Sequence, residues 1–536
     1  MTTYVTLYRM TPEMHWARWG DPDLAQQLPQ AARDLIEAAF GPADEHPPTD
    51  LDGIRLPEPL AADLAEELRA MLGAEHLLLD HETRVRHTRG KSTTDLLKMR
   101  GGDGSDAPDA VVRPADHDQV AAVVAWCGER HVALVPFGGG TSVVGGLAAK
   151  REGYAGVVAV DLARLKRLVS VDSESGIAVL EAGLLGPEAE ALLAEHNLTL
   201  GHFPQSFEYA SIGGFAATRS SGQASSGYGR FDDLVMGVRV ATPIGTLELG
   251  SAPANAAGPD LRELVLGSEG AFGVITSVTV RVRPVPVVRV YEGWRFASFM
   301  EGVAALRDLA QSGAAPTVVR LSDESETAIN LARPSEVGAA SAGGSLMITG
   351  CEGTQATVDA RRTTVAVRLG AHGGASLGEE AGSAWVAGRF HGPYLRDSLL
   401  DIGVLVETLE TATFWSNLRI LYDGVSAALE SALAEQGTPP IVLCHISHVY
   451  ETGASLYFTV AAKQNEDPLT QWEKAKAAAS DAMIAAGATI THHHAVGRDH
   501  KPWLAQEIGP VGVEILRAIK DRIDPAGVLN PGILIP

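Results

Sequence analysis

Two glycine-rich loops offer the first chemistry in this chain. One runs Pro136-Phe-Gly-Gly-Gly-Thr-Ser142, the other Gly267-Ser-Glu-Gly-Ala-Phe-Gly-Val-Ile275, and a Gly/Ser-rich stretch over 211–229 lies between them. Glycine lacks a Cβ and tolerates positive φ, so such loops let the backbone approach a ligand closely. Consecutive N–H groups in these turns bind anions, and a pyrophosphate is a suitable one. The three segments predict a ligand groove lined by backbone.

A row of histidines, Thr491-His492-His493-His494, could carry acid–base or anion-binding chemistry. Imidazole changes its charge near neutral pH, so these side chains could move a proton or bind a phosphate. Neighbouring residues of an extended chain point to opposite faces, so one metal cannot easily take all three, and we assign no metal ligand. A solvated loop without a role is the remaining interpretation.

Three further side chains have both a chemical and a structural interpretation. Tyr457 lies in a predicted strand, where a tyrosine usually belongs to the core, but a neighbouring cation could make it an acid/base. Arg396 carries a guanidinium that suits a phosphate or a carboxylate, and it could equally pair with adjacent Asp397. Arg320 could act in the site or tie two domains together.

The elements around the first loop distinguish between nucleotide folds. Residues 109–114 read as a short strand, Asp116 can cap a helix with Gln119 as its capping-box partner, and 132–136 read as the next strand. The glycine loop follows that second strand and opens no helix. A Rossmann fingerprint has its glycines between a strand and a helix, and a P-loop needs Gly-Lys-Ser/Thr, so the pattern disfavours the first and excludes the second.

These segments, in this order, resemble the PCMH-type FAD domain of the vanillyl-alcohol-oxidase superfamily, and within it the alkylglycerone-phosphate synthase family. The resemblance runs from about Trp19 to the C-terminus, and its most specific pieces include Gly201-His-Phe-Pro204, Leu456-Tyr-Phe458 and Thr491–His494. It implies an α+β fold: a two-subdomain PCMH-type FAD-binding domain, an α+β cap and a helical N-terminal leader.

The resemblance also implies roles for individual residues. The implied catalytic set is Tyr457, His492, His493, His494, Arg320 and His202, with Arg396 as the substrate-binding residue. The implied FAD-binding set is Pro136, Phe137, Gly138, Gly139, Gly140, Thr141, Ser142, Gln205, Ser206, Phe207, Glu208, Tyr209, Ala210, Ser211, Thr218, Arg219, Ser220, Ser221, Glu269, Gly270, Ala271, Phe272, Gly273, Val274 and Ile275. Because 138–146 contains no His or Cys, we expect FAD to be held without a covalent bond.

The activity implied by the resemblance is an exchange in ether-lipid synthesis. The acyl group of a 1-acyl-glycerone 3-phosphate is replaced by a long-chain alcohol, with flavin N5 as a covalent relay and no net redox change. This chain departs from the family at Gln205, where the family has an acid, and at Ala495, where it has glycine. An FAD-dependent dehydrogenase or oxidase of a 2-hydroxy acid or alcohol is therefore the alternative. A binding protein with a dead site is disfavoured because Tyr457, Arg396 and the histidines are all present.

Four regions are expected along the chain: a helical region over 1–103, the FAD domain over 104–284, the cap over 285–490, and a C-terminal segment over 491–536 that returns to the flavin. Periodicity predicts helices over 29–40, 60–72, 296–311, 354–369, 471–486 and 508–523. Strands are predicted over 287–294, 316–321, 345–351, 440–448, 455–461 and 488–490, and a loop over 338–344.

Composition excludes several classes of partner. The 536 residues carry a net charge of −23, which argues against nucleic acid and against a basic patch on anionic lipid. Cys127, Cys351 and Cys444 lack metal or redox spacing and read as buried free thiols. With no apparent signal peptide or spanning segment, we expect a cytoplasmic homodimer that takes a small lipid or hydroxy-acid substrate, with at most peripheral membrane contact.

Overall fold

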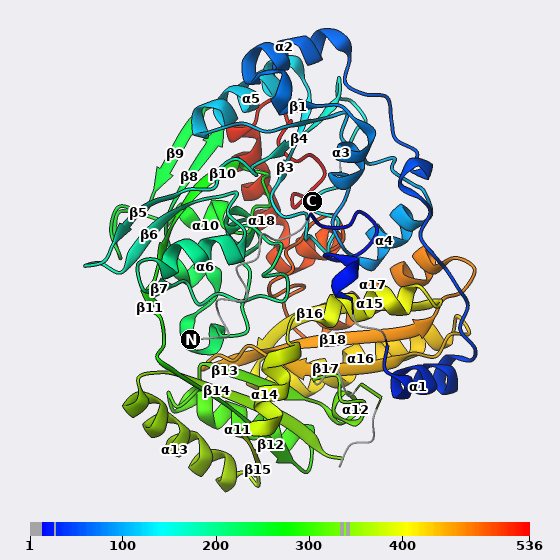
Figure 1. Cartoon of the computed structure of the whole chain (residues 1–536), viewed down its shortest axis with the longest axis vertical. Helices are drawn as coiled ribbons and strands as arrows, with labels where there is room; N and C mark the ends of the chain where they lie inside the picture. Colours follow the sequence, from blue (N-terminus) through cyan, green and yellow to red (C-terminus); the bar gives the residue numbers. More distant parts are fainter. Residues whose placement is uncertain (1–12, 26–27, 149, 333–336, 339–342) are drawn as a thin grey trace.

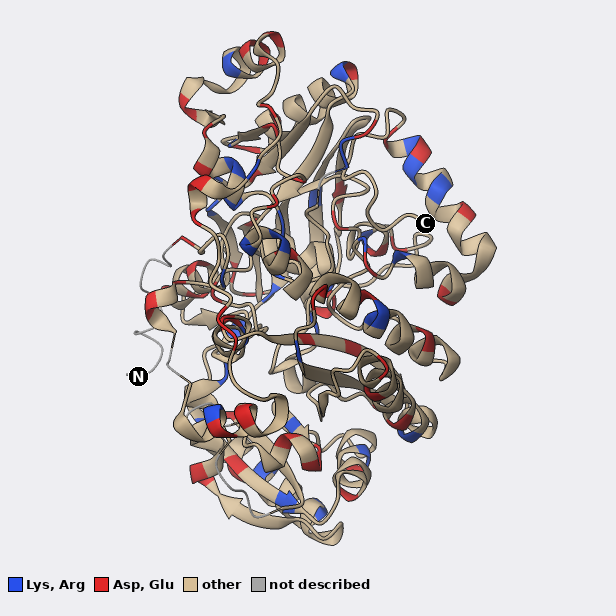
Figure 2. Ribbon diagram, turned by 90° about the vertical axis from the view of Figure 1, so that its right-hand side faces the viewer, with Lys and Arg blue, Asp and Glu red and all other residues tan. Residues whose placement is uncertain are grey.

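The computed structural model describes residues 13–536 apart from 26–27, 149, 333–336 and 339–342. It has an upper lobe, formed largely by the first half of the chain, and a lower lobe built on one large sheet (Figure 1). The C-terminal helix α18 (Lys501–Ile523) returns to the upper lobe. Asp and Glu residues are spread over both lobes (Figure 2).

The first sheet of the upper lobe carries the glycine loop at the end of a strand. It has the order β1-β2-β4-β3, with β2, β4 and β3 parallel. The strands are β1 (Leu77–Leu78), β2 (Ala110–Val112), β3 (Ala133–Phe137) and β4 (Val157–Asp161). Helix α5 (His117–Arg130) joins β2 to β3, and the Asp116 side chain accepts the Gln119 N–H at its start. The predicted order of strand, capped helix, strand and loop is confirmed.

The second sheet is antiparallel and has the order β5-β6-β10-β8-β9. Its strands are β5 (Leu168–Asp172), β6 (Ile177–Glu181), β8 (Val235–Thr242), β9 (Gly245–Leu249) and β10 (Val274–Arg281). One hydrophobic core joins the two sheets, with Leu134 and Val158 from the first and Val238 and Val278 from the second. This is the two-subdomain arrangement expected of a PCMH-type domain. A small pair of strands, β7 (Leu198–Thr199) and β11 (Arg283–Pro284), leads out of it.

The lower lobe is a seven-stranded antiparallel sheet in the order β15-β12-β14-β13-β17-β18-β16. The strands are β12 (Val288–Phe296), β13 (Val318–Ser322), β14 (Ser345–Gly353), β15 (Ala375–Gly378), β16 (Val404–Phe414), β17 (Ile441–Ile446) and β18 (Gly453–Lys463). Helices α11 (Phe299–Gln311), α13 (Gln355–Ala371), α16 (Leu418–Ala434) and α17 (Pro468–Ala485) contribute to the core on one face. Helix α14 (Glu379–Gly388) packs on the other face through Ala381 and Trp385.

The region over 1–103 is divided between the lobes. Helix α1 (Gln30–Phe40) lies against the lower lobe, where Ala32 and Ile36 contact Val337 and Leu395 (Figure 1). Helix α2 (Ala62–Leu72) joins the core of the upper lobe. The other helices are α3 (His81–Arg86), α4 (Thr93–Arg100), α6 (Gly186–Ala194), α7 (Ile212–Thr218), α8 (Ser225–Tyr228), α9 (Phe231–Leu234), α10 (Arg262–Val265), α12 (Glu324–Ala328) and α15 (Gly392–Leu400).

Most predicted cap elements exist, and several were not foreseen. The sequence analysis did not identify β16 or helices α14, α15 and α16. The strand expected over 488–490 is reduced to one bridge, between Ala412 and Thr489. Helix α18 begins before the expected 508 and is broken at Gly509, where φ is 71° and Pro510 follows. The loop expected over 338–344 lies partly outside the described residues. Cys127, Cys351 and Cys444 are buried and free, as expected.

Candidate functional site

A cavity of about 460 Å³ lies between the two lobes. Its upper wall is made by the predicted glycine loop, by parts of 204–223 and by parts of 269–275. Its lower wall is one face of the seven-stranded sheet, with α15 and the apolar side of α1. The segments singled out by sequence therefore meet around one space.

The first glycine loop presents unused hydrogen-bond donors to this cavity. Within the described residues, the backbone N–H groups of Gly138, Gly139, Gly140 and Thr141 have no acceptor, although all four residues line the cavity. Backbone donors are rarely left unpaired in a protein, so a run of four suits an anionic ligand. A pyrophosphate, as found in FAD, matches this cradle.

The glycines are also required by packing between loops. A Cβ on Gly139 would overlap the Tyr209 carbonyl, and one on Gly138 would overlap the Ser211 hydroxyl. The loop can therefore lie against the Tyr209 backbone only if position 139 is glycine, whereas a side chain at 138 would require the Ser211 side chain to move. Steric exclusion by a neighbouring loop thus adds to the predicted need for close approach to a ligand.

The third glycine segment is tied to the C-terminal segment by Glu269. Its carboxylate accepts the N–H of Val496 at 3.1 Å and of Gly497 at 2.7 Å. Burial raises the pKa of Glu269 to about 7. Asn530 Nδ2 donates to the carbonyls of Glu269 and Gly146, so it links the first and third loops. Residues 491–536 thus reach the upper wall of the cavity.

The predicted FAD-binding residues divide into two groups. Those that line the cavity are Pro136, Phe137, Gly138, Gly139, Gly140, Thr141, Ser142, Gln205, Ser206, Ala210, Ser211, Thr218, Ser220, Ser221, Glu269, Gly270, Gly273, Val274 and Ile275. Those outside its lining are Phe207, Glu208, Tyr209, Arg219, Ala271 and Phe272. Phe207, Ala271 and Phe272 are buried in the protein, and Arg219 pairs with Glu263, so these residues support the loops from behind.

Alternation along the cap strands places the polar residues on the cavity face. On β18, Leu456 and Phe458 point into the helix-covered core, so Tyr457 faces the cavity. The same alternation brings His445 of β17 and Arg320 of β13 to this face. The His445 ring stacks on Tyr457 with centroids 4.8 Å apart, and Arg320 Nη1 lies 3.0 Å from His445 Nε2.

His445 links Arg320 to Tyr457, and the carboxylate of Glu326 contacts both Arg320 and His445. Arg320 Nη2 pairs with Glu326 Oε1 at 2.7 Å, and His445 Nδ1 lies 2.9 Å from Glu326 Oε2. Burial alone would raise the pKa of Glu326, but Arg320 and His445 outweigh it and lower the pKa to about 2. Burial raises the pKa of Tyr457 to about 12. The phenol is therefore protonated at neutral pH, contrary to an activation by neighbouring cations.

The histidine row is organised by one buried carboxylate that sequence analysis missed. Glu410 on β16 accepts the backbone N–H groups of His492, His493 and His494 at 2.6, 3.1 and 2.8 Å. Burial would raise the Glu410 pKa, yet the nearby histidines hold it well below its usual range. His493 and His494 line the cavity, and their ring centroids lie 6.1 and 5.7 Å from that of Tyr457. The His492 side chain lies outside the cavity lining and contacts Tyr450.

His202 lies outside the cavity, whereas Arg396 lines it. His202 is buried behind the cavity wall, with Nε2 3.1 Å from Ser220 Oγ and its ring against Phe215 and Phe231. Arg396 lines the cavity, but Nη1 donates to the Lys91 carbonyl at 2.5 Å and Nη2 lies 3.3 Å from Asp397. Both interpretations of Arg396, ion pair and ligand contact, thus remain available to the same side chain.

A second arginine that sequence analysis missed lies on the cavity with fewer partners. Arg389, at the end of α14, has its guanidinium carbon 5.4 Å from the Phe203 ring centroid and 4.9 Å from that of Phe390. No carboxylate in the described ranges pairs with it. The charged groups that line the cavity are Lys91, Arg320, Arg389, Arg396, Glu269 and Glu407. Cations thus predominate inside an acidic protein, which favours an anionic substrate.

The fold and this cavity define a class. A two-subdomain domain with unpaired glycine-loop donors, facing a seven-stranded cap, is that of an FAD-dependent enzyme of the PCMH type. Family models agree: residues 108–250 match the description "FAD binding domain", and 285–534 match "FAD linked oxidases, C-terminal domain".

Relatives narrow the class. Alkyldihydroxyacetonephosphate synthase of Dictyostelium discoideum is 34% identical, covering 92% of this chain and 84% of the relative. The enzyme of that name from Trypanosoma brucei brucei is 32% identical, covering 98% of this chain and 92% of the relative. A solved alkyldihydroxyacetonephosphate synthase structure superimposes with a TM-score of 0.83 at 30% identity, covering 98% of this chain and 100% of that one. The chain belongs to the alkyldihydroxyacetonephosphate synthase family, also called alkylglycerone-phosphate synthases.

Proposed function

We propose that this FAD-dependent enzyme replaces the acyl group of a 1-acyl-glycerone 3-phosphate by a long-chain alcohol, forming an ether and releasing a fatty acid. One observation carries the proposal: a single cavity combines free glycine-loop donors, a group of cations and an apolar end. The relatives named for this activity support the same assignment.

The apolar end suits the long chains of both substrates. It is lined by Leu28, Ala32, Leu35, Ile36, Phe40, Leu331, Ala332, Val337, Leu395, Leu399, Val404, Val406, Ile441 and Leu443. Each buried CH₂ group of an acyl or alkyl chain would contribute about 0.8 kcal/mol to binding. At the other end, Arg389 and Arg396 can take the phosphate, for which a guanidinium fork is suited.

Proton movement at the exchanging oxygens falls to Tyr457. FAD, held by the first glycine loop, would supply the reactive ring for this exchange, which needs no net redox change. The Tyr457 hydroxyl, protonated because burial raises its pKa to about 12, donates to the carboxylate oxygen that leaves C1. It then accepts the proton of the alcohol whose oxygen bonds to C1. His445 and Arg320 hold the phenol, and Glu410 holds His493 and His494 beside it.

Anaerobic turnover tests the reaction class. The purified enzyme with FAD is mixed with a palmitoyl-glycerone phosphate and a long-chain alcohol without an electron acceptor. We expect many turnovers of ether product by mass spectrometry, with the flavin absorbance returning to the oxidised form. A single bleaching by a 2-hydroxy acid or alcohol, with no ether formed, would establish the dehydrogenase alternative instead.

Cellular location and assembly remain predictions. No helix in the described ranges has the length and apolar character needed to cross a bilayer. We expect a cytoplasmic homodimer that meets its lipid substrate by peripheral contact. Cell fractionation and light scattering on the purified protein measure the two properties separately.

A further inference from the structure

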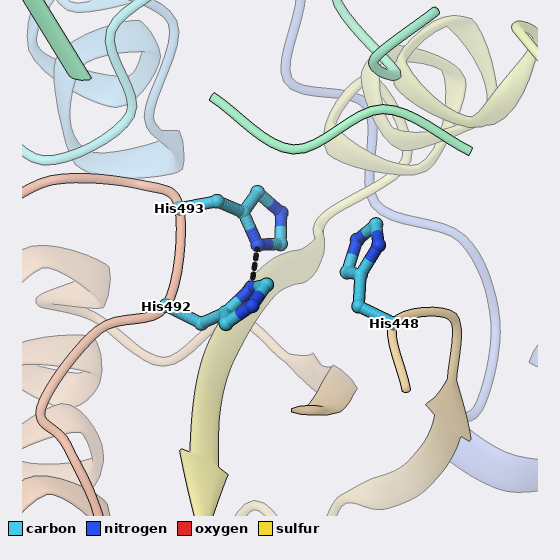
Figure 3. Close-up of side chains that lie close together, drawn as sticks. All are labelled: His448, His492 and His493. Atoms are coloured by element: carbon cyan, nitrogen blue, oxygen red, sulfur yellow. Dashed lines mark hydrogen bonds between the residues drawn. The ribbon is translucent and has the colours of Figure 1, made fainter. Parts of the chain in front are cut away.

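Three histidines from two distant segments converge beside the catalytic face of the cap. His448 follows β17, whereas His492 and His493 lie in the loop that Glu410 organises (Figure 3). One nitrogen of each ring lies within 4.8 Å of a nitrogen of the other two. All three residues are largely shielded from solvent, and the rings of His448 and His492 are stacked with centroids 5.1 Å apart.

Each imidazole has one nitrogen held by a protein partner. His448 Nδ1 lies 2.7 Å from Ser225 Oγ and 3.1 Å from Ser221 Oγ. His492 Nε2 lies 2.5 Å from the Tyr450 hydroxyl, and His493 Nδ1 lies 3.3 Å from Glu410 Oε2. Metal-binding histidines are fixed in a similar way, because their second ring nitrogen donates to a carboxylate, a backbone carbonyl or water. In this site two of the three partners are hydroxyl groups. His448 Nε2, His492 Nδ1 and His493 Nε2 are thereby left as the candidate ligand atoms.

We propose that His448, His492 and His493 bind a divalent transition-metal ion, with zinc the first candidate. Imidazole nitrogens favour zinc, copper and nickel over magnesium or calcium. Zinc–nitrogen bonds of about 2.0–2.1 Å in a tetrahedron place ligand atoms roughly 3.3 Å apart. One nitrogen of each ring already lies within 4.8 Å of the others, so rotations of the imidazole rings would bring the ligand atoms to that spacing. The Nδ1 atoms of His492 and His493 are 3.0 Å apart. With the ion bound, the lone pair of His492 Nδ1 would point to the metal. His493 Nδ1 would then donate its proton to Glu410 instead of to His492.

The position of this site gives it access to ligands. His448 and His493 line the cavity, so the fourth coordination position of a tetrahedral ion faces the space that holds the substrate. A water molecule or an anionic oxygen would fill that position. His494 does not take part, because its ring lies edge-on to Tyr457 instead. Two of the three adjacent histidines thus share an ion with a third from a different strand end, which the sequence pattern did not reveal.

Metal binding by the FAD-loaded, tag-free enzyme tests this inference without any turnover. After dialysis against ZnCl₂ and then metal-free buffer, we expect one zinc per chain by mass spectrometry. X-ray absorption should show three nitrogen ligands at about 2.0–2.1 Å. His448→Ala and His492→Ala should each weaken zinc binding more than about 100-fold while the flavin absorbance stays unchanged, because losing a ligand exceeds the loss of an outer partner. Ser225→Ala, which removes only an outer partner, should weaken it about tenfold.

His372 provides a matched control, because it lies outside the histidine cluster. His372→Ala removes a histidine that pairs with Asp308 rather than with other histidines, and should leave the zinc content unchanged. Zinc that binds equally to wild type and His448→Ala, or an absorption spectrum with fewer than two histidine ligands, would overturn the proposal. If His448→Ala loses FAD, the wild-type spectrum and Ser225→Ala still decide. Because no step depends on ether formation, failure here is separate from failure of the proposed function.

Discussion

The Glu410 carboxylate accepts the backbone N–H of His492 at 2.6 Å, across 82 residues of sequence. The same side chain accepts the two following N–H groups and the Thr491 hydroxyl, so one buried acid fixes the whole turn. Glu410 also lies directly opposite Tyr457 in the β16–β18 ladder. The loop that carries the histidines is therefore set in register with the proposed proton donor.

Replacing Glu410 by Gln should reduce turnover while FAD is retained. An amide offers one acceptor oxygen where the carboxylate offers two, so at least one buried N–H is left unpaired. Hydrogen bonds to charged groups contribute about 1.5–3 kcal/mol, so we expect kcat to fall roughly 10–100-fold with a smaller change in KM. Exposed Glu435→Gln serves as the control. Unchanged kcat in Glu410→Gln would show that the turn does not position the reacting groups.

Gly139→Ala should abolish FAD retention, because the new Cβ overlaps the Tyr209 carbonyl and forces the donor loop away from 209–211. The flavin absorbance per protein after gel filtration measures this. Gly128→Ala is the control, since a Cβ there meets no atom within 4 Å.

When the wild-type protein is denatured, the flavin that it releases should be free FAD, since 138–146 contains neither His nor Cys. Flavin that remains on the denatured chain would contradict the non-covalent assignment.

Tyr457→Phe removes one hydroxyl and should preserve packing against His445. If the phenol moves the proton, turnover should fall about 10²–10⁴-fold, the usual contribution of general acid–base catalysis. Flavin content should not change. Tyr154→Phe, which removes a hydroxyl bonded to the Gly527 carbonyl, is the matched control. A loss of less than a few-fold in Tyr457→Phe would show that the Tyr457 hydroxyl does not move the proton.

We expect replacements of Arg389 and Arg396 to have different kinetic effects, although both residues line the cavity. Arg389→Met should raise KM for the phosphate-bearing substrate roughly 10–100-fold, because its guanidinium has no carboxylate partner among the described residues. Arg396→Lys should lower activity and retain FAD, since lysine keeps the charge but not the fork that reaches the Lys91 carbonyl. Exposed Arg419→Met should change neither constant. Equal KM in wild type and Arg389→Met would leave the phosphate to Arg396.

Glu190 should make stability depend on pH. Burial raises its pKa from 4.5 to about 7, although Thr199 and Gly201 donate hydrogen bonds to it. The folded state then binds more protons than the unfolded state, so this contribution to stability falls as pH rises from 4.5 through about 7. The melting temperature of Glu190→Gln relative to wild type should therefore rise across that window. Glu195→Gln, at the exposed end of the same helix, should show no such trend.

The sequence by itself determined the local features of this protein. Features that depend on neighbouring residues can be predicted from the sequence alone. Asp116 caps α5, glycines mark the loops that approach a ligand, and alternation on β18 separates Tyr457 from Phe458. Each depends on residues a few positions apart. The family followed from the order of such segments. Helices α14 to α16 and strand β16 were not identified, so Arg389 and Glu410 had no predicted position.

Only the tertiary structure decided which side chains share a site. Glu410 meets the histidine turn, His448 meets His492, and His445 stacks on Tyr457 through strand register that no local pattern encodes. Packing between two loops places His202 behind Ser220 rather than in the cavity. Burial likewise raises the pKa of Tyr457 rather than activating the phenol, because desolvation in the folded chain outweighs the effect of Arg320. Periodicity acts over a few residues, whereas pairing and desolvation depend on segments that meet only after folding.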